Sequence, residues 1–121
     1  MKSILIIMSF FSFLFGSNTQ QNDTITILDK PSFKMAINSK KVQLVDVRTP
    51  NEFNAGHIKN AKNIDFFNQS NFIKEFNKLN KEEPIYLYCR SGNRSQKAAR
   101  KLDSLGFKKI FDLKGGYMNW N

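Results

Sequence analysis

Residues 88–95, YCRSGNRS, hold the chain's only cysteine among residue types that favour an anion. Arg90 and Arg94 supply positive charge beside it, and Gly92 permits a backbone conformation that a Cβ would obstruct. Cysteine reacts as its thiolate, which neighbouring cations and a helix amino terminus stabilise. The stretch therefore predicts a nucleophilic Cys89. The alternative is a buried structural cysteine in an ordinary strand-to-helix turn.

The residues around Cys89 predict a strand, a loop and a helix. Residues 85–88 are an uninterrupted apolar run of the kind that is buried in parallel sheets. Ser95 can cap the helix that follows, whose apolar stripe includes Ala98 and Leu102. Ligands of open α/β sheets bind at the carboxyl ends of strands. We therefore expect one anion-binding position beside Cys89, formed by the backbone amides of Arg90, Ser91, Gly92, Asn93, Arg94 and Ser95.

Short apolar runs alternate with helical patterns along the rest of the chain. The expected strands are residues 24–28, 42–47, 63–66, 85–88 and 110–113. Helices are expected to start near Asp29 and at Ser95, with another over residues 72–79. Residues 48–61 are expected to be mostly loop, with one helical turn around Glu52. This alternation predicts an α/β fold: a single domain with a mainly parallel central sheet flanked by helices.

The composition is that of one folded domain, and it excludes several classes of function. The chain has 121 residues, 40% of them hydrophobic, which is enough for one core and too little for two domains. The net charge of +9 favours anionic substrates, but no basic run interleaved with aromatic residues predicts binding to nucleic acid. No His/Cys cluster could hold a metal, and no Gly-rich nucleotide loop follows a strand. We therefore expect no metal, no cofactor and no nucleic acid.

Residues 1–17 have the pattern of a secretory signal peptide. Lys2 precedes the apolar stretch 4–15, and the small residues Gly16 and Ser17 follow it. The stretch is shorter than the ~20 apolar residues of a membrane-spanning helix. We expect export to the periplasm or another extracytoplasmic compartment, leaving residues 18–121 as the domain, with no stable membrane insertion after processing. A retained amino-terminal anchor is the alternative.

Three separated stretches resemble the rhodanese-like sulfurtransferase family. CRSGNR, residues 89–94, is similar to the family's six-residue loop around a cysteine that carries a persulfide. LVDVRTPNEFNAGHIKNAKNI, residues 44–64, resembles the family's amino-terminal signature. GFKKIFDLKGGYMNW, residues 106–120, resembles its closing G-F, L-x-G-G and W elements. The three stretches occur in the family's order.

The resemblance implies one rhodanese-like domain that transfers sulfur. Cys89 would take the outer sulfur of a small anionic donor such as thiosulfate as a persulfide, and cyanide or a thiol would remove it. Arg90 or Arg94 would hold the donor's oxygens. We expect a monomer. Two alternatives stay open: a non-catalytic rhodanese-like binding module, and a cysteine-dependent phosphatase of related fold, whose loop is one residue longer.

Four further residues have expected supporting roles. Asp46 and Arg48 end a strand that should neighbour the strand before Cys89, and the resemblance suggests that they brace the loop. Pairing with each other at the surface is the alternative. Glu52 could pair with an arginine. His57 lies in G-H-I, which in the resembling family is a structural corner, so a structural role is favoured over that of a general base.

Export predicts that the native protein is shorter than the full chain. Protein recovered from its own cells should lack about its first sixteen to eighteen residues, because cleavage follows small residues such as Gly16 and Ser17. Intact-mass measurement of the native protein tests this directly. A mass that begins at Met1, found in the membrane fraction, would indicate the anchor instead.

Overall fold

The computed structural model describes residues 23–121, so the predicted leader (residues 1–17) and residues 18–22 lie outside the described part. Within residues 23–121 no helix is long and apolar enough to cross a membrane. The strands are β1 (Ile25–Leu28), β2 (Gln43–Asp46), β3 (Lys62–Asn63), β4 (Ile85–Tyr88) and β5 (Ile110–Leu113). The helices are α2 (Lys30–Ser39), α3 (Pro50–Ala55), α4 (Gln69–Phe76), α5 (Asn93–Ser104) and the 3-10 helix η1 (Tyr117–Asn119).

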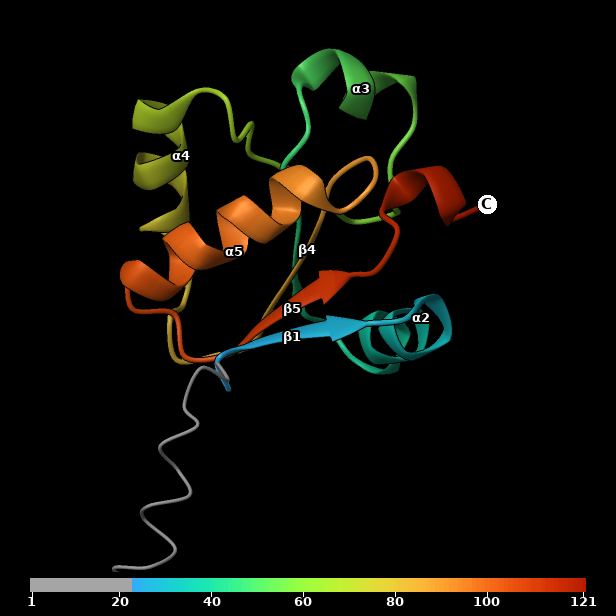
Figure 1. The fold of residues 1–121 in the computed structure, drawn as a ribbon, viewed down its shortest axis with the longest axis horizontal. Coiled ribbons are helices and arrows are strands. Elements are labelled where there is room, and N and C mark those ends of the chain that lie inside the picture. The colour runs from blue at the N-terminus through green and yellow to red at the C-terminus, as the bar shows by residue number, and fades with distance from the viewer. Residues whose placement is uncertain (1–22) are drawn as a thin grey trace, which may run out of the picture.

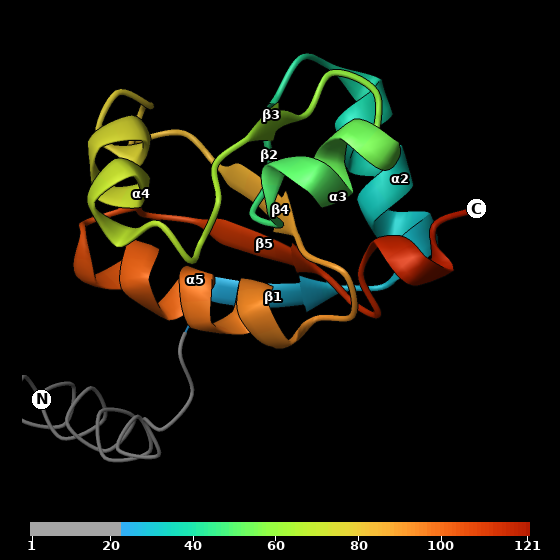
Figure 2. The same cartoon turned by 90° about the horizontal axis from the view of Figure 1, so that it is seen from above.

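The described strands form one parallel sheet in the order β1-β5-β4-β2-β3. β4 is the central strand, with β5 on one side and β2 on the other (Figure 2). The predicted single α/β domain with a parallel sheet is confirmed. Because Cys89 follows β4 directly, it lies at the carboxyl edge of the sheet, where open α/β folds bind their ligands.

Alternation along β4 divides the core between the two faces of the sheet. Ile85, Leu87 and Cys89 pack in a cluster that includes side chains of α4 and α5. Tyr86 and Tyr88 pack in the opposite cluster with residues of α2. Figures 1 and 2 show α4 and α5 on one side of the sheet and α2 on the other. The pleat therefore directs the cysteine side chain toward the layer that contains α5.

Helices α2 and α3 begin where local side chains cap them. Asp29 caps α2 by accepting a hydrogen bond from the Ser32 amide at 3.0 Å, as its position before the helix predicts. α3 is a six-residue helix, so the expected loop over residues 48–61 contains more helix than one turn. Its capping box explains the difference, because Thr49 and Glu52 bind each other's backbone amides.

The predicted boundaries of β3 and α4 were wrong. β3 covers Lys62–Asn63 rather than residues 63–66, although the amides of Ile64 and Phe66 still donate to carbonyls of Asp46 and Val47. α4 ends at Phe76, so Leu79 lies beyond the helix while still packing against the core. Apolar periodicity identified both elements, but it does not show where the regular hydrogen bonding stops.

Candidate active site

The loop between β4 and α5 folds back on the sulfur of Cys89. The Gly92 amide donates a hydrogen bond to Cys89 Sγ at 3.0 Å. Gly92 has a φ of +110°, in the left-handed region where a side chain is strained, so this turn depends on glycine. Cys89 itself is only 1% exposed, so it is accessible only to a small reagent.

α5 begins at Asn93, and the prediction that Ser95 caps it was wrong. Gly92 occupies the N-cap position, while Ser95 is buried in the first turn and its hydroxyl donates to the Gly92 carbonyl at 3.3 Å. The left-handed backbone at Gly92 closes the loop early and lets the helix begin at the next residue. The first-turn amides of α5 have no acceptor within the helix. They therefore place the positive end of the helix dipole directly after the cysteine loop.

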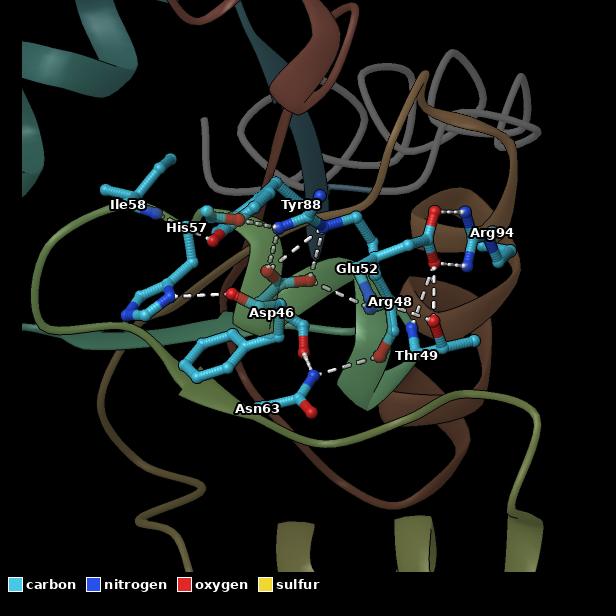
Figure 3. A network of polar contacts seen from close by, with 11 residues as sticks. Asp46, Arg48, Thr49, Glu52, His57, Ile58, Asn63, Tyr88 and Arg94 are labelled. Atoms are coloured by element: carbon cyan, nitrogen blue, oxygen red, sulfur yellow. Dashed lines mark hydrogen bonds and ion pairs between the residues drawn. The ribbon is translucent and has the colours of Figure 1, made fainter.

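Arg94 is held by Glu52 of α3 in a two-point ion pair (Figure 3). Its guanidinium nitrogens lie 2.7 Å and 2.9 Å from the two carboxylate oxygens. These hydrogen bonds hold the pKa of Glu52 at about 2, well below its ordinary value. The expected pairing of Glu52 with an arginine is confirmed. Arg94 thus ties the first turn of α5 to α3, and part of its charge is already neutralised.

Arg90 differs from Arg94 in being exposed. Within residues 23–121, no carboxylate lies within ion-pair distance of its guanidinium. The side chains of Ser91 and Asn93 are also exposed. Arg90 is therefore the loop cation that is available to an arriving anion.

Asp46 and Arg48 form an ion pair in the interior rather than at the surface. Asp46 is 0% exposed and Arg48 is 4% exposed. Arg48 Nε and Nη2 both donate to the carboxylate, the shortest contact being 2.6 Å, and Nη2 also donates to the Gly56 carbonyl. The side-chain Nδ2 of Asn63 donates to the backbone carbonyls of both residues (Figure 3). The pair thus joins the end of β2 to the segment after α3.

The pair reaches the cysteine loop through aromatic rings. The Arg48 guanidinium lies 4.4 Å from the centre of the Tyr117 ring and 5.6 Å from that of Tyr88. Burial raises the pKa of Tyr88, and its hydroxyl accepts a hydrogen bond from the Ile58 amide at 3.0 Å. The Tyr117 amide donates to the Cys89 carbonyl at 2.8 Å. Any bracing of the loop by Asp46 and Arg48 is therefore indirect.

Residues 116–118 contact the backbone of the cysteine loop, and this contact was not predicted from the sequence. Besides Tyr117, the Met118 amide donates to the Arg90 carbonyl at 3.0 Å. Gly116 has a φ of +65°, and a Cβ there would lie 2.4 Å from the Arg90 carbonyl oxygen and 2.7 Å from that of Cys89. The glycine pair in L-x-G-G was the available signal, since adjacent glycines mark places where two backbones come close.

His57 makes contacts that suit a structural role. Its Nδ1 lies 2.9 Å from the Phe53 carbonyl oxygen, and its ring stacks on the Phe53 ring with centres 3.7 Å apart. Both residues belong to α3 or the turn after it. Residues 23–121 contain no group of three or more His, Cys, Asp or Glu side chains that could hold a metal ion.

The chain is an α/β protein with a cysteine in a six-residue loop at the carboxyl edge of its parallel sheet. Comparison with known proteins gives the family. A family model described as a rhodanese-like domain matches residues 29–121, so the chain belongs to this family. The crystal structure of a rhodanese-like domain protein from Staphylococcus aureus matches it with a TM-score of 0.69 and 33% identity, covering 79% of this chain and 91% of that one.

The relatives include one protein named as a sulfurtransferase and one named as a tRNA hydroxylase. Thiosulfate sulfurtransferase GlpE of Shewanella oneidensis is 37% identical over 83 residues, which are 69% of this chain and 79% of GlpE. The tRNA uridine(34) hydroxylase of Pelagibacter ubique is 36% identical over 104 residues, which are 86% of this chain but 35% of the hydroxylase. The predicted family is confirmed, and it is broader than the sulfurtransferases.

Replacing Gly116 by alanine should release the cysteine loop. The added Cβ overlaps the carbonyls of Cys89 and Arg90, so the amides of Tyr117 and Met118 should lose their acceptors and exchange their hydrogens about tenfold faster or more. Gly106→Ala is the matched control. Gly106 also has a positive φ, but its Cβ would meet only the Lys81 side chain, at 3.9 Å. Unchanged exchange at Tyr117 and Met118 in Gly116→Ala would contradict the close approach.

Replacing Glu52 by glutamine should flatten the acid dependence of stability. The stability that comes from the lowered pKa is fully present above about pH 4.5 and is lost as the pH falls toward 2. Because both side chains keep some contact with water, we expect a loss of about 1–2 kcal/mol at neutral pH. Urea unfolding of both proteins between about pH 2 and pH 7 measures the difference. Glu82→Gln, at an exposed position, is the control. If the unfolding free energies of wild type and Glu52→Gln change with pH in parallel, the ion pair between Glu52 and Arg94 does not stabilise the fold in this way.

Proposed function

We propose that this protein is a sulfurtransferase that carries sulfur as a persulfide on Cys89. The observation that carries the proposal is the hydrogen bond from the Gly92 amide to Cys89 Sγ, made in a six-residue loop at the positive end of α5. Such an environment stabilises a sulfur anion, whether it is the thiolate or the terminal sulfur of a persulfide. Kinship with thiosulfate sulfurtransferase GlpE supports the same reaction.

The proposed reaction is a double displacement. The Cys89 thiolate attacks the outer sulfur of thiosulfate, a new S–S bond forms at Cys89, and sulfite leaves with the electron pair of the broken S–S bond. In the second step cyanide or a thiolate attacks the outer sulfur of the persulfide. Thiocyanate or a new persulfide leaves, and the Cys89 thiolate returns. No redox partner is required, because each broken bond is replaced by one that forms.

The two loop arginines have different parts in this proposal. Arg90, which is exposed and has no carboxylate partner within residues 23–121, would hold the donor's anionic oxygens. Arg94 is already bound by Glu52 and would fix the loop rather than the donor. The first-turn amides of Asn93, Arg94 and Ser95 would stabilise the transferred sulfur.

Loop size and burial favour a sulfur donor over a phosphate ester. Residues 89–94 span six positions, one fewer than the resembling phosphatases use to surround a tetrahedral phosphate. A cysteine that is 1% exposed can receive a single terminal sulfur atom more readily than a bulky ester. We propose further that the protein is exported, since residues 1–17 have the pattern of a leader. We also propose that it works as a monomer.

The intermediate can be measured directly, because Cys89 is the sole thiol of the chain. Incubation with thiosulfate alone should add the mass of one sulfur atom, and cyanide should remove it as thiocyanate. Cys89→Ser should fold normally, since the two side chains differ little in size, yet lose both the added mass and turnover. Intact-mass spectrometry and thiocyanate release provide the two readouts.

A thiol elsewhere should not replace Cys89. The double variant Cys89→Ser/Ser104→Cys restores one thiol at an exposed position near the end of α5, and it should remain inactive. Sulfur transfer by this variant or by Cys89→Ser would exclude the mechanism. Folded wild-type protein that neither gains sulfur nor releases thiocyanate would favour the binding module, and turnover of an aryl phosphate would favour the phosphatase.

A further inference from the structure

A cavity of about 810 Å³ lies between α2, the start of β2 and the segment before β3. Its apolar lining includes Ile37, Val42, Leu44 and Ile58, of which Leu44 and Ile58 are buried. The volume falls within the roughly 300–1,000 Å³ that is usual for small-molecule sites. None of residues 89–95 lines the cavity, so it is separate from the cysteine loop.

Lysines supply all the charge of this cavity. Lys34, Lys40, Lys41 and Lys59 line it, and each is exposed. They come from three places in the chain: α2, the connection to β2, and the turn before β3. No acidic residue is among the lining residues. Cations gathered around a concave apolar floor concentrate the field there and attract anions.

Trp120 gives the cavity a flat aromatic wall. Trp120 is among the lining residues, and Lys34 Nζ lies over its ring at 5.5 Å from the centre. The Phe33 ring packs against the indole in a T-shaped arrangement, with centres 6.2 Å apart. An indole face accepts planar apolar groups by stacking. The Trp120 ring, the apolar lining residues and the four lysines together favour a ligand that is flat and apolar at one end and acidic at the other.

We propose that this cavity binds a small organic anion with an aromatic or otherwise flat apolar body, its acid group among the lysines and its body against Trp120. An inorganic anion would leave the apolar floor unused. A neutral hydrophobe would leave four like charges without a counter-ion. The volume matches a free small molecule better than a protein segment. The inference goes beyond sulfur transfer and does not depend on Cys89.

The test uses naphthalene-1-sulfonate as the probe and the indole N–H of Trp120 as the reporter. Trp120 is the only tryptophan, so its indole gives a single signal in a ¹⁵N-labelled sample. Titration should shift that signal together with the amides of Leu44 and Ile58, and binding should weaken as salt rises from about 0.02 to about 0.5 M. Naphthalene-1-sulfonamide has the same body without the charge and should bind at least about tenfold more weakly.

Matched variants separate the cavity from general attraction to a basic protein. Lys40→Gln/Lys41→Gln should weaken sulfonate binding by about tenfold, because two cations are removed from the rim. Lys97→Gln/Lys108→Gln removes the same charge from exposed positions that do not line the cavity, and it should bind as wild type. Cys89→Ser should bind normally even if sulfur transfer is disproved. Equal binding of sulfonate and sulfonamide, or equal loss in the two double variants, would overturn the proposal.

Discussion

The arrangement of the site depends on the buried ion pair between Asp46 and Arg48. A charge in the interior must be paired, and leaving one partner alone in such a place generally costs about 3–5 kcal/mol. Here the arginine does more than neutralise the aspartate. It binds the Gly56 carbonyl and lies over the rings of Tyr88 and Tyr117. One side chain thereby links the end of β2, the turn after α3, the central strand and the segment that holds the cysteine loop.

Much of the fold could be predicted from the sequence, because its signals are local. Apolar runs bounded by turn residues located the strands, and Asp29 before Pro31 located the start of α2. The position of Cys89 between a buried run and a helix was enough to place it at the carboxyl edge of the sheet. The parallel direction of the strands followed from the alternation of strands and helices. These features depend on residues that are close together in the sequence, so one amino-acid sequence was sufficient to predict them.

The remaining features of the site depend on contacts between residues far apart in the chain. The sequence indicated that Gly92 could adopt an unusual backbone conformation, but it did not show that Gly92, rather than Ser95, is the N-cap. The choice of Glu52 as the partner of Arg94 requires that α3 lie beside α5, which periodicity does not show. The same holds for Tyr117, whose backbone amide, rather than its side chain, contacts the loop. Almost every residue type can donate a hydrogen bond from its backbone N–H, so residue types alone do not reveal such a contact.

The loop that contains Cys89 is held by a segment that the ribosome makes later. A chain grows from its amino end, so β4 and Cys89 emerge before the turn at Gly116 and the amides of Tyr117 and Met118. Until that segment docks, the carbonyls of Cys89 and Arg90 lack these two donors. An unfinished chain therefore carries its thiol without the full support of the mature loop. The backbone around Cys89 therefore reaches its final hydrogen bonding only after residues 116–118 have been made and have docked.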